Sequence, residues 1–230
     1  MFAIVKPEER HTASHGWLTS IFHFSFADYN DPKNQGWGSL RVFNDDFIAS
    51  GGKFGMHPHA NYEIMTVVLS GAIEHGDSMG NKGSIGEFQV QAMTAGTGIR
   101  HSEENTGKTQ LHSCQIWIRP KKLGAKPTYK TATFSKSDFH NKLCKIVSGK
   151  NDSPLQILQD ASISRSQLQK GKSLEYEFEN EYGYLFVISG KLAANGNVLH
   201  ESYSAKIRNE KKIKIIAGQD CDFLLFDLAP

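Results

Sequence analysis

The chain has 230 residues, 39% of them hydrophobic, and its 26 Lys and Arg nearly balance its 24 Asp and Glu, for a net charge of +2. This hydrophobic content excludes a disordered chain, and the balanced charge gives no broad reason to expect nucleic acid or an anionic membrane as a partner. The three cysteines, Cys114, Cys144 and Cys221, do not form the pattern of a disulfide framework and suit a reducing compartment. Since the start lacks the features of a signal peptide and no stretch approaches the ~20 apolar residues of a membrane span, we expect a cytoplasmic protein.

Short apolar or alternating runs, each closed by turn residues, occur at residues 39–52, 62–71, 83–98, 111–120, 182–196 and 221–230. This spacing is typical of an all-β sandwich or barrel. Helical periodicity is nearly absent, and the best weak candidate for one or two helical turns is SISRSQLQKG, residues 162–171. Residues 119–127, RPKKLGAKP, hold two prolines around a basic, glycine-containing stretch. They predict an interdomain linker rather than a nucleic-acid patch.

Two segments of the chain resemble each other. Residues 54–71 and 173–190 have equal length and end in Ser-Gly after an apolar run, which we interpret as a weak internal repeat. In register, three residues of the first copy fall opposite aromatic residues of the second: His57 opposite Tyr176, His59 opposite Phe178 and Glu63 opposite Tyr182. If the chain is a duplicated barrel, only the first copy has kept polar ligands.

Histidine pairs give the first indication of chemistry. His57 and His59 are spaced i and i+2, which in a strand puts both imidazoles on one face with their roots ~6.6 Å apart. Such a pair alone is a weak signal, because about 0.4 His-x-His pairs are expected by chance at this histidine content. Glu63 follows closely, and His101 and Glu103 repeat the same spacing beside another glycine-rich turn. Two same-face pairs of this kind predict a metal site.

The residues around these pairs resemble a known family. GMHPHANYEIMTVVLSGAIEHGDSMGN, FQVQAMTAGTGIRHSEEN and the opening HGWLTSIFHFSFADYNDP are similar to pirins, and most of all to the shorter bacterial pirins known as quercetin 2,3-dioxygenases. The resemblance implies two tandem cupin barrels of the jelly-roll type, packed face to face. We expect a metal-binding domain at residues 1–120 and a domain without metal at 121–230.

The resemblance also implies the ligands of a single metal ion, which are His57, His59, His101 and Glu103. Glu63 occupies the glutamate position of the general cupin motif, but pirins take their fourth ligand from the HSE motif, so we expect Glu63 beside the ligands. Ala60 departs from the family, many members of which carry a basic residue there.

Other readings of these histidines stay open. The alternative for the three candidate ligands is that they are ordinary barrel-interior histidines whose ring nitrogens form hydrogen bonds within the protein. His112 and Cys114 share a strand face, where core packing is the better explanation. The remaining histidines have no paired ligand nearby and are expected to be structural or exposed; they are His11, His15, His23, His75, His140 and His200.

Three imidazoles and one carboxylate suit Fe(II), Mn(II), Co(II), Ni(II), Cu(II) or Zn(II), and the resemblance favours Fe(II). One carboxylate leaves about one positive charge on the site, which favours a deprotonated flavonol hydroxyl. The implied activity is the opening of a flavonol ring such as that of quercetin by O₂, with Glu103 as the catalytic residue that accepts the hydroxyl proton.

The alternative is a metal-dependent or redox-sensing regulatory protein that binds an enzyme or transcription factor. The length of the chain, shorter than that of animal pirins, weakens the transfer of their transcription-cofactor role. For partners we expect a small aromatic substrate and O₂, no direct contact with nucleic acid or membrane, and a monomer that leaves room for a protein partner.

Overall fold

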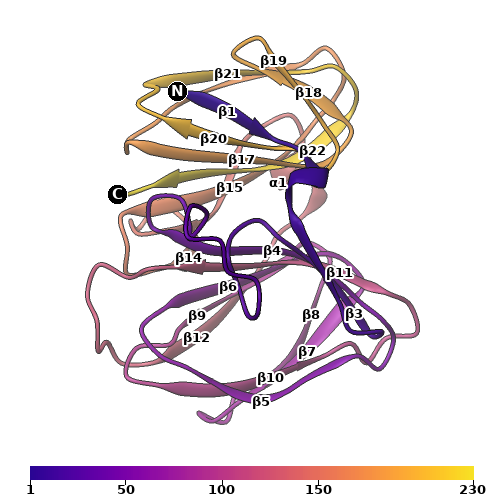
Figure 1. Cartoon of the computed structure of the whole chain (residues 1–230), viewed down its shortest axis with the longest axis vertical. Coiled ribbons are helices and arrows are strands. Elements are labelled where there is room, and N and C mark those ends of the chain that lie inside the picture. Colours follow the sequence, from indigo (N-terminus) through magenta and orange to yellow (C-terminus); the bar gives the residue numbers. More distant parts are fainter.

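The computed structural model describes residues 1–230, and β-strands form nearly all of its regular structure (Figure 1). The helical part is limited to α1 (Lys136–Phe139) and the single 3₁₀ turn η1 (Pro7–Glu9). None of the helical segments has the length and apolar character needed to cross a membrane. The all-β prediction is therefore confirmed.

The first domain consists of two facing sheets. Its seven-stranded sheet contains, in spatial order, β12 (Thr128–Thr133), β9 (Gln89–Thr94), β6 (Glu63–Ser70), β11 (Leu111–Ile118), β4 (Leu40–Ile48), β3 (Leu18–Phe22) and β2 (His11–Ser14). Its four-stranded sheet contains β5 (Lys53–His59), β10 (Ile99–Glu104), β7 (Ala72–Asp77) and β8 (Lys82–Gly86).

The second domain repeats this plan. Its seven-stranded sheet contains β1 (Phe2–Val5), β20 (Ser204–Arg208), β17 (Tyr182–Ser189), β22 (Cys221–Leu228), β15 (Ala161–Leu168), β13 (Cys144–Ser148) and β14 (Leu155–Gln156). Its four-stranded sheet contains β16 (Ser173–Glu177), β21 (Lys212–Ala217), β18 (Lys191–Ala194) and β19 (Asn197–His200). The repeat seen in the sequence corresponds to β5 and β6 in the first domain and to β16 and β17 in the second. Two tandem barrels, as predicted, are present.

One strand of each domain comes from the other side of the predicted boundary. The N-terminal β1 pairs with β20 in the second domain, where Figure 1 shows it in indigo among orange and yellow strands. Strand β12 pairs with β9 in the first domain. Residues 119–127, expected to link the domains, therefore join two strands of one sheet, and the chain crosses to the second domain after β12. The domain division at residue 120 stays a prediction. Strand β1, which precedes residue 120, belongs to a sheet of the second domain, and β12, which follows it, belongs to a sheet of the first.

Hydrogen bonds and close packing hold residues 119–127 against two turns of the first domain. The carbonyl of Ala125 accepts a hydrogen bond from the backbone N–H of Thr97 at 2.9 Å, and the side chain of Asn61 accepts one from Gly124 at 2.8 Å. Gly96, with φ +48°, lies so close to Ala125 that an added Cβ would come 2.0 Å from its carbonyl oxygen. Only glycine fits this approach of the turn to the connecting segment.

The predicted helical turn at residues 162–171 is wrong. Residues 161–168 form β15, which pairs along its length with β22. The segment alternates serine with larger residues, a period of two that suits a strand, and the long ladder with β22 overrides weak local preference. Arg165 on this strand is buried and makes two hydrogen bonds with Asp222, at 2.7 and 3.0 Å.

The largest hydrophobic core lies between the domains. It contains 23 buried residues drawn mainly from the two seven-stranded sheets, which pack face to face. Phe43 on β4 is fully buried and meets three aromatic rings of the second domain edge-on: Tyr184 at 5.9 Å, Phe186 at 5.1 Å and Phe226 at 5.5 Å. The two barrels thus share one core, and each also has an interior of its own.

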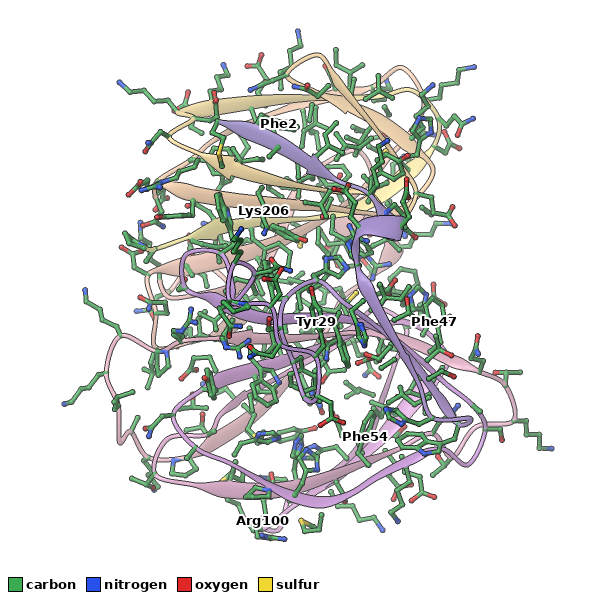
Figure 2. All side chains as sticks on the ribbon, viewed as in Figure 1. Phe2, Tyr29, Phe47, Phe54, Arg100 and Lys206 are labelled. Carbon is green, nitrogen blue, oxygen red and sulfur yellow. The ribbon has the colours of Figure 1, made fainter.

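Residues 29–37, which precede β4, add polar contacts to the interface between the two domains. Figure 2 shows Lys206 of the second domain above Tyr29 of this segment. Lys206 Nζ donates a hydrogen bond to Asn34 Oδ1 at 2.8 Å, and Trp37 Nε1 donates one to the carbonyl of Gly183 at 2.9 Å. Both bonds join the domains across the edge of the apolar core.

Truncation of the shared core should destabilise the whole molecule. Phe43→Ala removes a fully buried ring that contacts both domains, and we expect the free energy of unfolding to fall by about 3–5 kcal/mol. Urea unfolding followed by circular dichroism measures it, with Val198→Ala, at a residue that is 45% exposed, as the control. A loss for Phe43→Ala no larger than that for Val198→Ala would contradict an interdomain core.

Candidate metal centre

Two neighbouring strands carry the residues predicted as ligands. In the ladder between β5 and β10, His57 lies directly opposite His101, and the register shifts between His101 and Glu103. His59 follows His57 on the same face of β5, because alternate residues of a strand point the same way. The structure thus brings the His-x-His and His-x-Glu motifs, 42 residues apart, onto one inner surface of the first barrel.

The three histidine rings converge. Their centroids are 4.7 Å apart for His57 and His59, 4.4 Å for His57 and His101, and 4.8 Å for His59 and His101. The Nε2 atoms of His59 and His101 are 2.9 Å apart. His57 Nδ1 lies 2.7 Å from the carbonyl oxygen of Gly55, a contact that makes Nδ1 the hydrogen-bond donor and leaves Nε2 free for a metal.

Burial prepares two of these rings for metal binding. Desolvation, with a contribution from the neighbouring histidines, lowers the pKa of His101 to about 3 and that of His59 to about 4. Both rings are therefore neutral at physiological pH, with a lone pair available on nitrogen. A metal does not have to displace a proton from either of them.

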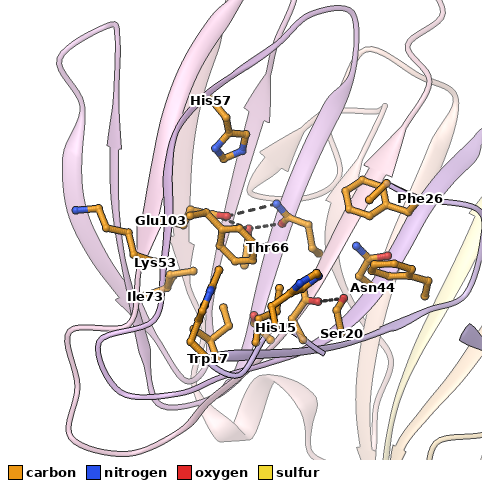
Figure 3. A pocket seen from close by; sticks show the side chains of 18 of the residues that line it. His15, Trp17, Ser20, Phe26, Asn44, Lys53, His57, Thr66, Ile73 and Glu103 are labelled. Atoms are coloured by element: carbon orange, nitrogen blue, oxygen red, sulfur yellow. Dashed lines mark hydrogen bonds between the residues drawn. The ribbon is translucent and has the colours of Figure 1, made fainter. Parts of the chain in front are cut away.

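Glu103 is buried among polar side chains of the opposite sheet. Its Oε1 accepts hydrogen bonds from Gln91 Nε2 at 2.6 Å and Thr66 Oγ1 at 3.2 Å, and its Oε2 lies 3.5 Å from Gln115 Nε2. Figure 3 shows Thr66 beside Glu103. Burial raises its pKa to about 7, although the bonds from Thr66 and Gln91 act in the opposite direction. These partners fix the orientation of the carboxyl group, and its proton affinity is poised near neutrality.

The structure adds a fourth histidine to the cluster. Two overlapping groups have ligand atoms that all lie within 4.8 Å of one another: His57, His59 and His101 form one, and His75, His101 and Glu103 form the other. His75 lies opposite Glu103 in the ladder between β7 and β10, and its ring stacks on Tyr129 at 4.2 Å. His75 was expected to be structural or exposed, and the structure buries it beside His101 and Glu103. The available signal was its pairing at i and i+2 with Asp77, whose Oδ2 lies 3.3 Å from His75 Nε2.

Glu63 does not join this cluster. It lies three residues from Thr66 on β6 and so faces the opposite side of the sheet, toward the second domain. Its Oε2 accepts a hydrogen bond from Thr94 at 2.8 Å, and burial raises its pKa against the effect of bonds from Thr94 and the Leu158 backbone. The expected place beside the ligands is therefore corrected. His112 is also absent from the cluster, since its Nε2 lies 2.6 Å from Asp45 Oδ1.

The cluster opens onto a cavity of about 630 Å³ inside the first barrel, a volume within the range usual for small-molecule sites. Five aromatic residues contribute to its walls: Trp17, Phe22, Phe26, Phe54 and Trp117. Figure 3 shows His57 and Glu103 on one side of this cavity, and Asn44 and Ser20 away from His57. The cavity depends on residues 15–27, whose role no motif in the sequence indicated.

The second barrel has no counterpart of this centre. One row of inner residues in the first barrel runs across paired strands as Gln91, Thr66, Gln115 and Asn44. The equivalent row in the second barrel is Ala205, Leu185, Leu225 and Ser164. The position of His101, opposite His57, becomes that of Ile213, opposite Tyr176. The interior of the second barrel is a core of 14 buried residues.

This asymmetry predicts about one metal ion per chain. The double variant His57→Ala/His59→Ala removes two of the three converging imidazoles, and we expect its metal content after saturation and desalting to fall close to zero. Elemental analysis measures it, and His112→Ala, a histidine outside the cavity, is the control that should retain metal. A content near two per chain in the wild type, or metal retained by the double variant, would disprove the assignment.

Asp46 on the cavity floor predicts a pH dependence of stability. Burial is the main cause that raises its pKa to about 7, with Asp45 and Glu103 acting in the same direction and a hydrogen bond from Ser20 opposing them. An unfolded aspartate titrates near ~4, so the folded state binds the extra proton between these values, and stability falls as pH rises through this window.

Asp46→Asn removes this contribution. Relative to wild type, the metal-free variant should gain about 2–3 kcal/mol of unfolding free energy between pH 5 and pH 8. Urea unfolding at both pH values is the measurement, with the exposed Asp28→Asn as the control for loss of a carboxylate. Equal pH profiles for Asp46→Asn and wild type would show that Asp46 does not titrate in this window.

Comparison with known proteins identifies the family. The family model described as Pirin matches residues 5–118, and the one described as Quercetinase C-terminal cupin domain matches residues 145–228. A quercetin 2,3-dioxygenase of Escherichia coli K12 is 42% identical over 234 residues and 100% of both chains. A pirin-like protein of Caulobacter vibrioides is 41% identical over 94% of this chain and 95% of its own.

Solved structures agree. The bacterial pirin YhhW of Escherichia coli in complex with nickel(II) matches with a TM-score of 0.93 and 40% identity over 100% of both chains. A quercetin 2,3-dioxygenase of Acinetobacter baumannii matches with a TM-score of 0.81 at 20% identity, which supports the fold. The expected bicupin fold is confirmed, and the chain belongs to the pirin family.

Proposed function

We propose that this protein is a metal-dependent dioxygenase that opens the ring of a flavonol such as quercetin with O₂. The observation that carries the proposal is the position of the histidine and glutamate cluster at the wall of an aromatic-lined cavity of about 630 Å³. The name of the Escherichia coli relative and the wider family support an oxygenase. The choice of a flavonol substrate rests on the names of these relatives, and the aromatic walls of the cavity suit a planar ring.

His57, His59, His101 and Glu103 are the proposed ligands. The convergence of the three rings and the neutral state of His59 and His101 suit a borderline divalent metal. When bound, such a metal supplies a Lewis acid and a centre for reaction with O₂. We favour Fe(II), as the family resemblance implies, with Ni(II), Cu(II), Co(II), Mn(II) and Zn(II) compatible with the same donors.

Glu103 is the proposed proton acceptor. The carboxylate of Glu103 lines the cavity beside the ligand histidines, and a carboxylate next to a bound hydroxyl group is a suitable general base. Gln91 and Thr66 donate hydrogen bonds to its Oε1, so the carboxylate is oriented before a substrate arrives. The aromatic side chains in the walls of the cavity suit packing against a planar ring.

His75 lies beside His101 and Glu103, and we assign it a structural role rather than that of a ligand. Its Nε2 contacts Asp77, which pairs with His101 across the β7–β10 ladder. Its stacking on Tyr129 fixes the plane of the ring. We propose that His75 restricts the space beside His101 and Glu103 and so limits how the cluster can rearrange.

Oxygen consumption tests the function. Metal-free protein is reconstituted with Fe(II), Ni(II) or Cu(II), and O₂ uptake is followed with and without quercetin. We expect uptake that requires both the metal and the flavonol. If none of these metals supports flavonol-dependent uptake, the dioxygenase is rejected in favour of a metal-dependent regulatory protein that binds an enzyme or transcription factor.

A pair of matched variants tests the proton acceptor. Glu103→Gln keeps the shape and an oxygen donor but loses the charge and the basicity. We expect weaker metal binding and a fall in quercetin turnover of about 100-fold or more at saturating metal. Glu63→Gln, on β6 of the seven-stranded sheet and facing away from the cavity, should keep both metal and turnover within about threefold. Turnover of Glu103→Gln near the wild-type rate would remove Glu103 as the base.

A further inference from the structure

The cavity contains a second polar group of residues on the side away from His57, formed by Ser20, Asn44 and Asp46. Ser20 on β3 lies opposite Asp46 in the ladder with β4, and Asn44 and Asp46 are spaced i and i+2 on one face of β4. All three line the cavity, and Figure 3 shows the hydrogen bond from Ser20 on the cavity floor. None of them is a proposed metal ligand.

These side chains are buried and incompletely paired. The exposed fractions are 1% for Ser20, 3% for Asn44 and 6% for Asp46. Ser20 Oγ donates to one oxygen of Asp46, and the other oxygen has no donor within the protein. Asn44 Oδ1 is buried without any hydrogen-bond partner. Both side chains line the cavity, and because buried polar groups are nearly always paired, their incomplete pairing indicates a ligand that forms hydrogen bonds with them.

The second barrel shows that the fold does not require these residues. Following the paired strands, Asn44 corresponds to Ser164 and Asp46 to Ser166. A barrel of the same topology, filled by a hydrophobic core, thus has neither an amide nor a carboxylate at these two positions. The amide of Asn44 and the carboxylate of Asp46 are therefore present only in the barrel that also contains the cavity and the histidine cluster.

Aromatic rings lie around the cavity. Phe26 packs edge-on against Phe22 at 5.3 Å and against Trp117 at 5.4 Å, and Trp117 in turn packs edge-on against His59 at 4.7 Å. This series reaches from β3, beside Asn44, to the ligand strand β5. A planar aromatic molecule is therefore suited to span the two polar ends.

We infer that Asn44 and Asp46 form a specificity subsite that accepts hydrogen bonds from a hydroxyl group on the substrate ring remote from the metal-binding oxygens. The inference deepens the proposed function, on which its choice of aromatic substrate rests. A site built to bond a hydroxyl rejects the analogue that lacks it, because its own buried acceptors are then left unpaired. The protein should therefore select polyhydroxylated flavonols over unsubstituted ones.

Binding of two flavonols tests the subsite without turnover. Quercetin and 3-hydroxyflavone share the hydroxyl-ketone pair that binds a metal, and only quercetin carries the other ring hydroxyls. Protein loaded with Zn(II) is titrated with each in the absence of O₂ by calorimetry, at pH 8 so that Asp46 is ionised. The variants are Asn44→Leu and Asp46→Asn. Asp45→Asn, the neighbouring residue on the opposite face of β4, is the matched control.

Wild-type protein should bind quercetin more tightly than 3-hydroxyflavone. Each cavity variant should weaken quercetin about tenfold, a usual effect of losing a hydrogen bond to a buried group, and should change 3-hydroxyflavone less than about twofold. Asp45→Asn should leave both affinities unchanged. Melting curves identify a variant that fails to fold, in which case the other cavity variant decides.

Three results overturn the subsite: equal affinity of the wild type for both flavonols, an equal loss for both in the cavity variants, or no binding of quercetin by the wild type. The proposed function is judged separately by O₂ uptake. Selective binding without uptake would reject the dioxygenase and keep the subsite. Equal binding with normal uptake would keep the dioxygenase and reject the subsite.

Discussion

The face-to-face packing of the two seven-stranded sheets is the interaction on which the rest of the molecule depends. Its 23-residue core and the separate 14-residue core of the second barrel contain most of the buried apolar side chains. Because alternate residues of a strand face opposite sides, β6 contributes Met65 and Val67 to this shared core and Thr66 to the cavity. The first barrel can therefore keep a polar, open interior, since its outer face supplies the stability that its inside does not.

The same barrel plan serves two purposes in one chain. In the first domain, glutamine and threonine side chains reach across the interior to hold Glu103, whereas the equivalent row of the second domain packs alanine and leucine into a closed core. A polar row of this kind is costly to bury unless each group finds a partner. Glu103 is the hydrogen-bond partner of Gln91, Thr66 and Gln115. The side-chain oxygen of Asn44, at the end of the row, has no hydrogen-bond partner in the protein.

The fold class and the histidine cluster could be predicted from the sequence because both depend on short-range patterns. The alternation of residues 111–118 and the spacing of His57 and His59 report strands and a shared face directly. What was missed depends on pairing between distant strands. His75 lies beside the cluster because β7 pairs with β10, which places it opposite Glu103, and the face of β6 that carries Glu63 is turned away from the cavity because it packs on the second domain. No local pattern indicates that β1 leaves the first half of the chain.

The position of β1 affects how the molecule is assembled during synthesis. Phe2 pairs with Ile207, so at ~5–20 residues per second the ribosome delivers the partner strand roughly 10–40 seconds after β1 itself. The segment must stay unpaired through that interval, while β12 is needed much sooner to complete the sheet of the first barrel. Strand β1 thus completes the edge of the second domain's seven-stranded sheet only after that domain has been synthesised.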